Sequence, residues 1–127
     1  MEKALTSQLI AVTRHESALV VRLLGTLAMQ EVAPLDRELA RIADEKPQWV
    51  VVDLSGVELI ASCGMGSLIA FRRDVAKAGG TVLLAGATPQ VAESLRRAFL
   101  HKLFKICAAV PEALAAAGSR GTPLASG

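Results

Sequence analysis

Short apolar runs alternate with amphipathic stretches along this chain, and the two patterns predict different elements. Apolar runs at residues 9–13, 18–24, 49–52 and 81–85 are typical of buried strands, and residues 103–106 are expected to lead into a short last strand. The polar residues 14–17 separate the first two runs, which predicts a hairpin with a solvated His15 on its turn. Gly25 and Thr26 are expected to close the second strand of this hairpin.

The amphipathic stretches predict four helices. The first is expected to start near Ala33 and Pro34, because proline is tolerated in the first turn, and to stop at residues 46–47. The second follows Gly64 and ends at residues 79–80. Thr88 provides an N-cap for the third, with Pro89 in its first turn, and residues 111–117 form the last.

The second helix has an irregular apolar stripe. Its predicted inward residues are Met65, Leu68, Ile69, Val75 and Ala76. Arg72 falls within this stripe and is expected to reach past it to the helix edge. Phe71 falls off its centre and is therefore expected to be exposed, where it would suit a partner surface.

The element order is therefore β-β-α-β-α-β-α-β-α, which predicts an α/β fold with a mixed sheet and helices packed on it. A chain of 127 residues that is 52% hydrophobic is long enough for one domain with one core. We expect this domain to span residues 1–117. The small and polar residues 118–127 are expected to form a disordered tail.

The stretch at residues 49–66, WVVVDLSGVELIASCGMG, is expected to carry the function. Its β-branched run predicts the central strand, LSGVELIA is predicted to be a loop, and Gly64 and Gly66 bracket Met65 before a helix. A buried strand that leads through a short turn into a helix is where α/β folds place functional groups. Ser62 and Cys63 lie on that turn.

Composition excludes several classes of function. The net charge is only +2, aromatic residues make up 3%, and there is no tyrosine, so we expect no nucleic-acid partner. Cys63 and Cys107 are far apart, and His15 and His101 are isolated, which predicts no metal site and no cofactor. The cysteines are expected to be reduced in a cytoplasmic protein, with Cys107 in the core. No signal peptide is apparent at the N-terminus. No apolar run reaches the ~18 residues of a span, which predicts no direct membrane insertion.

Several motifs together resemble the STAS domain, the family of bacterial anti-sigma-factor antagonists that also supplies the cytoplasmic domain of sulphate transporters. The resemblance covers roughly residues 8–117. It is carried by GTL at 25–27, VVVDLSGVELI at 50–60, SCGMGSL at 62–68, AGGTVLLAGATPQV at 78–91 and LFKI at 103–106. It implies a non-enzymatic protein-interaction module with a sheet of about five strands and four to five helices. Its partner would be an anti-sigma factor that is also a GHKL-type serine kinase.

The chain departs from the family pattern at the phosphorylation site. The family turn reads Asp-Ser-Ser-Gly-Leu-Gly, and the kinase phosphorylates its second serine. Here Ala61 replaces the aspartate, Ser62 matches the first serine and Cys63 replaces the phosphoacceptor. Ala28 replaces a second family aspartate, which follows the second strand. A thiol is a poor substitute for a positioned hydroxyl, so the resemblance implies a module without the standard switch. AFLHK, before LFKI, is also longer than the usual family turn.

We expect the partner to contact the turn and the exposed face of the helix after it. The residues assigned to this contact are Ala28, Ala61, Ser62, Cys63, Gly64, Met65, Gly66, Ser67 and Phe71. Ser62 is the alternative phosphoacceptor. Two other functions stay open, namely a STAS subunit of a phospholipid-trafficking ABC transporter and a redox sensor based on Cys63, since a helix N-terminus favours thiolate. The sequence leaves the oligomeric state open, with a homodimer among the options.

Overall fold

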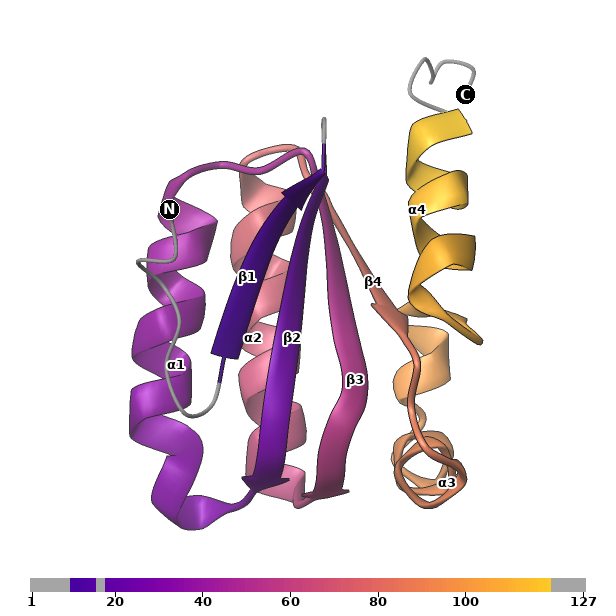
Figure 1. Ribbon diagram of the computed structural model, residues 1–127. Helices are drawn as coiled ribbons and strands as arrows, with labels where there is room; N and C mark the ends of the chain where they lie inside the picture. Colours follow the sequence, from indigo (N-terminus) through magenta and orange to yellow (C-terminus); the bar gives the residue numbers. More distant parts are fainter. Residues whose placement is uncertain (1–9, 16–17, 120–127) are drawn as a thin grey trace.

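The computed structural model describes residues 10–15 and 18–119. Five strands form one sheet in the order β1-β2-β3-β4-β5, which is also their order along the chain (Figure 1). The strands are β1 (Ile10–His15), β2 (Ala18–Leu27), β3 (Trp49–Ile60), β4 (Thr81–Ala85) and β5 (Lys105–Cys107). The pair β1–β2 is antiparallel and the other three pairs are parallel, so the sheet is mixed, as predicted.

The helices cover both faces of the sheet. They are α1 (Met29–Asp44), α2 (Ser62–Lys77), α3 (Pro89–Arg97), the short 3₁₀ helix η1 (Leu100–Lys102) and α4 (Val110–Ser119). Residues of α1, α2 and α3 share one core with the sheet, whereas α4 packs on the opposite face in a smaller cluster. Figure 1 shows α1 and α2 side by side on one side of the sheet and α4 on the other.

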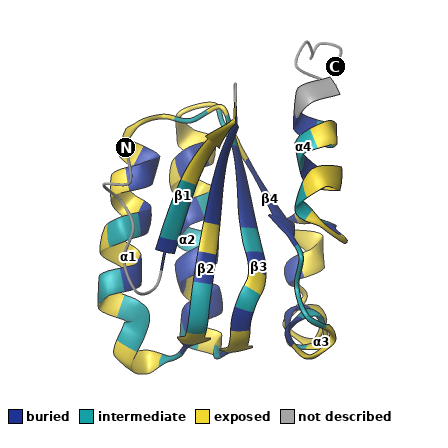
Figure 2. Ribbon diagram, in the orientation of Figure 1, coloured by how far each residue is buried: buried dark blue, intermediate teal, exposed yellow. Residues whose placement is uncertain are grey.

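The apolar run at the start of β3 explains this three-layer arrangement. Successive side chains of a strand point to opposite faces, so Val50 and Val52 join the larger core while Val51 joins the cluster under α4. All three are fully buried, and Figure 2 shows buried residues along β2, β3 and β4. The prediction of a central strand beginning at Trp49 is confirmed by its pairing with β2 and β4.

Other predictions of individual elements are also confirmed. The first two strands form the expected antiparallel hairpin, and His15 is exposed. Thr88 caps α3, with its Oγ1 accepting a hydrogen bond of 3.3 Å from the N–H of Val91. Cys107 is buried in the core. Helix α4 continues to Ser119, and the rest of the predicted tail, like Leu9 of the first apolar run, lies outside the described residues.

Two predicted boundaries are wrong. The expected loop LSGVELIA is strand as far as Ile60, because the pairing of β3 with β2 continues past two shifts in register. Gly25 lies at these shifts with a φ of 83°, a conformation that is readily available to glycine. Helix α1 begins at Met29, not near Pro34. Glu31 stabilises this earlier start, since its Oε1 accepts a hydrogen bond of 3.2 Å from the N–H of Ala28. Pro34 therefore lies inside the helix and removes one i→i−4 hydrogen bond.

Candidate functional site: the edge around Cys63

Strands β2 and β3 end side by side, and this brings two distant parts of the chain together. Leu27 pairs with Ile60, and the N–H of Ala61 donates a hydrogen bond of 2.9 Å to the carbonyl oxygen of Leu27. Ala28 and Ala61 follow as the N-caps of α1 and α2. The fold thus places Ala28, Ala61 and Cys63 at one edge of the sheet, where the arrowheads of β2 and β3 point in Figure 1.

The first turn of α2 presents an accessible side. Ser62 and Gly66 are exposed, and as residues i and i+4 of a helix they lie on the same side of it. Cys63 is a half-buried free thiol. A Cβ added to Gly66 would meet nothing within 4 Å, so the backbone of α2 is open to an approaching molecule there. These three residues fit the predicted contact surface.

Other residues of the same turn are buried, which corrects their assignment to the contact surface. Gly64, Met65 and Ser67 all face inward. A Cβ on Gly64 would lie 2.8 Å from the carbonyl oxygen of Leu27, so this glycine lets α2 pack closely against the end of β2. The Ser67 hydroxyl donates a 3.4 Å hydrogen bond to the Cys63 carbonyl oxygen. These residues position the turn and are not accessible to a partner.

The expectation that Phe71 is exposed is also wrong. Its side chain is only 2% exposed and is among the largest fully buried side chains of the core. The inward stripe runs through Gly64, Leu68, Phe71 and Val75, which are three or four residues apart, whereas the predicted stripe included Ala76, which is exposed. Phe71 is therefore a core residue and not part of a partner surface.

Two apolar residues at this edge were missed by sequence analysis. Met29, the first residue of α1, is 79% exposed, and Leu59, which pairs with Thr26 near the end of β3, is 44% exposed. Both were overlooked because the start of α1 was placed too late and the end of β3 was assigned to a loop. Leu59 precedes the buried Ile60, so strand alternation would have predicted its outward direction.

Neither of the two family carboxylates is present at this edge, where Glu31 supplies an acidic group bonded to the N–H of Ala28. Alanines occupy positions 28 and 61, and the first turn of α2 contains no acidic residue. Within the described part of the chain, no side chain hydrogen-bonds to the Cys63 thiol, and no group of three or more potential metal ligands is present. The same residues include no helix that is both long and apolar enough to cross a bilayer.

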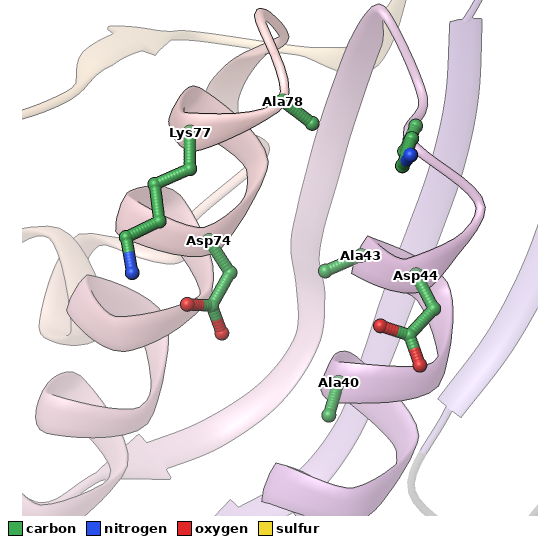
Figure 3. Close-up of a pocket in the computed structure, with 7 residues that line it drawn as sticks. Ala40, Ala43, Asp44, Asp74, Lys77 and Ala78 are labelled. Carbon is green, nitrogen blue, oxygen red and sulfur yellow. The ribbon is translucent and has the colours of Figure 1, made fainter.

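A groove at the far ends of α1 and α2 has different properties (Figure 3). Its lining residues are Ala40, Ala43, Asp44, Lys46, Asp74, Lys77 and Ala78. Asp44 and Asp74 come from the two facing helices, and the two lysines balance their charge. This groove lies at the C-terminal ends of the helices, whereas the Cys63 turn lies at the N-terminal end of α2. It is therefore separate from the edge around Cys63.

Known proteins share both the sequence pattern and this fold. The family model of the STAS domain matches residues 10–113, which include every strand, the Cys63 turn and α3. The chain belongs to the STAS domain family. The predicted resemblance and fold class are thereby confirmed, and members of this family that act as anti-sigma-factor antagonists are generally binding modules rather than enzymes.

Three solved structures illustrate the likeness of this STAS domain to others. An anti-sigma factor antagonist from Mycobacterium paratuberculosis is 25% identical with a TM-score of 0.78, and the match covers 84% of this chain and 91% of that one. The STAS domain of a SulP transporter from Vibrio cholerae is also 25% identical, with a TM-score of 0.68 and coverage of 84% and 85%. The phosphorylated form of SpoIIAA, a cell fate determinant of Bacillus, shares the fold at 16% identity, with a TM-score of 0.63 and coverage of 83% and 96%.

Proposed function

We propose that this STAS domain is a cytoplasmic protein-interaction module of the anti-sigma-factor-antagonist type that binds its partner without the standard serine phosphorylation switch. The partner would be an anti-sigma factor or a related GHKL-type kinase. The observation that carries the proposal is the edge where Ala28, Ala61 and Cys63 meet. In the stretch that resembles the family turn, these three residues provide neither an acceptor hydroxyl nor either carboxylate.

The contact surface in this proposal differs from the one expected from sequence. It consists of Met29, Leu59, Ser62, Cys63 and Gly66, which are exposed or half-buried at the ends of β2 and β3 and the starts of α1 and α2. Exposed apolar side chains beside an open stretch of helix backbone suit a protein partner better than a charged ligand. A switch by phosphate would require a hydroxyl and groups that orient the kinase, and this edge offers only Ser62.

Phosphorylation can be tested by intact mass after incubation with ATP and the GHKL-type kinases of the source organism. We expect no mass gain for the wild type and a weak gain for Cys63→Ser. The triple variant Cys63→Ser with Ala28→Asp and Ala61→Asp should gain one phosphate readily, because it restores the acceptor and both carboxylates. A phosphate on the wild type that is absent in Ser62→Ala would contradict the proposal that the domain has no phosphorylation switch.

Partner binding needs a separate measurement, since a module without a switch must still bind. We expect Met29→Ala and Leu59→Ala to weaken capture of the kinase, and a hot-spot residue typically contributes ~2 kcal/mol. Leu103→Ala is the matched control, because Leu103 is 41% exposed but lies on the segment between η1 and β5, away from these strand ends. Equal losses in all three variants would place the contact elsewhere.

A transport role is the second candidate, favoured by the 25% identity to the STAS domain of the Vibrio cholerae transporter. Co-purification with a permease and an ATPase, in the absence of any GHKL-type kinase, would support it. A redox sensor based on Cys63 has less support, because no described side chain is bonded to the thiol to activate it. Homodimerisation is compatible with each of these functions and can be measured by sedimentation.

A further inference from the structure

The corner where α3 passes into η1 combines an exposed aromatic side chain with a cluster of cations. Phe99 is 63% exposed and Leu103 is 41% exposed. The two residues are joined by successive turns, in which the N–H of Lys102 donates to the carbonyl oxygen of Phe99 at 3.1 Å and that of Leu103 donates to Leu100 at 2.9 Å. They therefore belong to one short, tightly turned segment, which we call the Phe99 corner (residues 96–105).

The Phe99 ring has one aromatic contact within the described residues, the His101 ring at 6.2 Å between centroids, and is otherwise mostly exposed. Helix α3 ends with Ala98 as its C-cap, and Phe99 follows in the left-handed conformation, with φ of 63° and ψ of 26°. Glycine is the usual residue at this position, and a side chain with a Cβ is strained there. Since the ring is mostly in solvent, burial does not offset this strain. A strained and exposed aromatic residue points to a contact outside the domain.

The segment around this residue carries a net positive charge. Residues 93–105 contain one carboxylate, Glu93, and four fixed cations, Arg96, Arg97, Lys102 and Lys105. The net charge of this segment is therefore +3, whereas the net charge of the whole chain is +2. Glu93 lies 3.7 Å from Arg96 and 3.3 Å from Arg97. No acidic group in the described part of the chain lies within 4.0 Å of either lysine. The corner therefore has an excess of positive charge available to an anionic surface.

We propose that the Phe99 corner binds the surface of an anionic lipid membrane, with the Phe99 ring in the interface and the surrounding cations at lipid phosphates. Aromatic rings favour the headgroup region, and each nearby Lys or Arg adds roughly fivefold to binding on an anionic leaflet. The contact is peripheral, because α3 has only 9 residues. A protein partner fits less well, since two protruding side chains provide far less than the ~800 Å² that each side of a stable interface buries.

Vesicle sedimentation provides the first test. The wild type should sediment with vesicles of equimolar phosphatidylcholine and phosphatidylglycerol, stay in solution with phosphatidylcholine alone, and be released by salt. Phe99→Gly should lower the partition coefficient about tenfold, and Lys102→Gln with Lys105→Gln should lower it about 25-fold. No binding of the wild type to the anionic vesicles would overturn the proposal and leave an acidic protein as the partner to seek.

Lys46→Gly is the matched control. Lys46 follows the C-cap of α1, is exposed, and has a φ of 55°, so this variant relieves the same backbone strain and removes a cation at another corner. Both glycine variants should raise the urea midpoint of unfolding, because glycine fits the left-handed conformation. Only Phe99→Gly should lose vesicle binding. An equal loss in Lys46→Gly would show that net charge, and not the Phe99 corner, causes binding.

A fluorescence measurement places the contact directly. Trp49 is the only tryptophan, so Phe99→Trp in a Trp49→Phe background has a single reporter at the corner. Its emission should shift to the blue when anionic vesicles are added, because the indole ring leaves water for the interface. Vesicle binding without such a shift would overturn the assignment to Phe99.

Discussion

The two glycines at the start of α2 should respond in opposite ways to the same substitution. Gly64 and Gly66 both lie in the first turns of the helix, where alanine is favoured over glycine by up to about 1 kcal/mol. A Cβ at position 66 meets nothing within 4 Å, so Gly66→Ala should stabilise the domain by about 0.5–1 kcal/mol. This would raise the melting temperature by about 2–4 °C.

The outcome at position 64 is set by a contact with the backbone. The added Cβ would lie 2.8 Å from the carbonyl oxygen of Leu27 and 3.0 Å from its Cβ, so the first turn of α2 would have to move away from β2. Overpacking of this kind costs about 1–3 kcal/mol, which exceeds the gain in helix propensity. We therefore expect Gly64→Ala to destabilise the domain by up to about 2 kcal/mol.

Urea unfolding of the two variants measures the difference in free energy directly. The propensity gain is similar at both positions and cancels in the comparison, so the difference of about 1–3 kcal/mol reports the contact with Leu27. If both variants were stabilised equally, α2 would not pack against the end of β2 as described. The described proximity of Ala28 and Cys63 at the candidate site would then be wrong.

Three further substitutions test other parts of the structure. Phe71→Ala should destabilise the domain by about 3–5 kcal/mol in urea unfolding, because it leaves a cavity in the core. An unchanged urea midpoint of unfolding would show that Phe71 lies on the surface. Ala61→Asp should stabilise it by about 1 kcal/mol, since the present N-cap has no side-chain hydrogen bond, whereas Ala61→Val, the control without a cap, should not. Burial, aided by the charge of Glu112, raises the pKa of the Cys107 thiol above its ordinary value, so the folded state favours the neutral thiol. The contribution of Cys107 to the free energy of unfolding should therefore be fully present below the pKa of the unfolded thiol and be lost as the pH rises through the higher pKa of the folded state. Cys107→Ala should remove this decrease in stability at alkaline pH. A decrease that persisted in Cys107→Ala would have another origin.

The sequence predicted the sheet well because burial on both faces leaves a simple pattern. The run at residues 50–52 has no polar residue, so its strand was unambiguous. The second half of β3 contains Ser55 and Gly56, and only its pairing with β2 identifies it as strand. The start of α1 depended on the local bond between Glu31 and Ala28, which competed with the stronger signal of Pro34.

The candidate site was predicted in part, for similar reasons. The resemblance to the STAS family implied that Ala28, Ala61 and Cys63 lie together, and the parallel pairing of β2 and β3 accounts for their proximity. The exposure of individual residues was harder to predict. Phe71 was misplaced because Ile69 and Ala76 were counted in the stripe and shifted its phase, and only the packed structure shows which side faces the sheet.

The order of strands in the sheet has a consequence for synthesis on the ribosome. Each strand pairs with the strand that precedes it along the chain, so no pairing must wait for a distant segment. The hairpin of β1 and β2 can form first, and β3 can join it after α1 has emerged. Since N-terminal segments leave the ribosome first, each new strand emerges after the strand with which it pairs. Only the short β5 strand and α4 must be added last, at the edge and face that remain open.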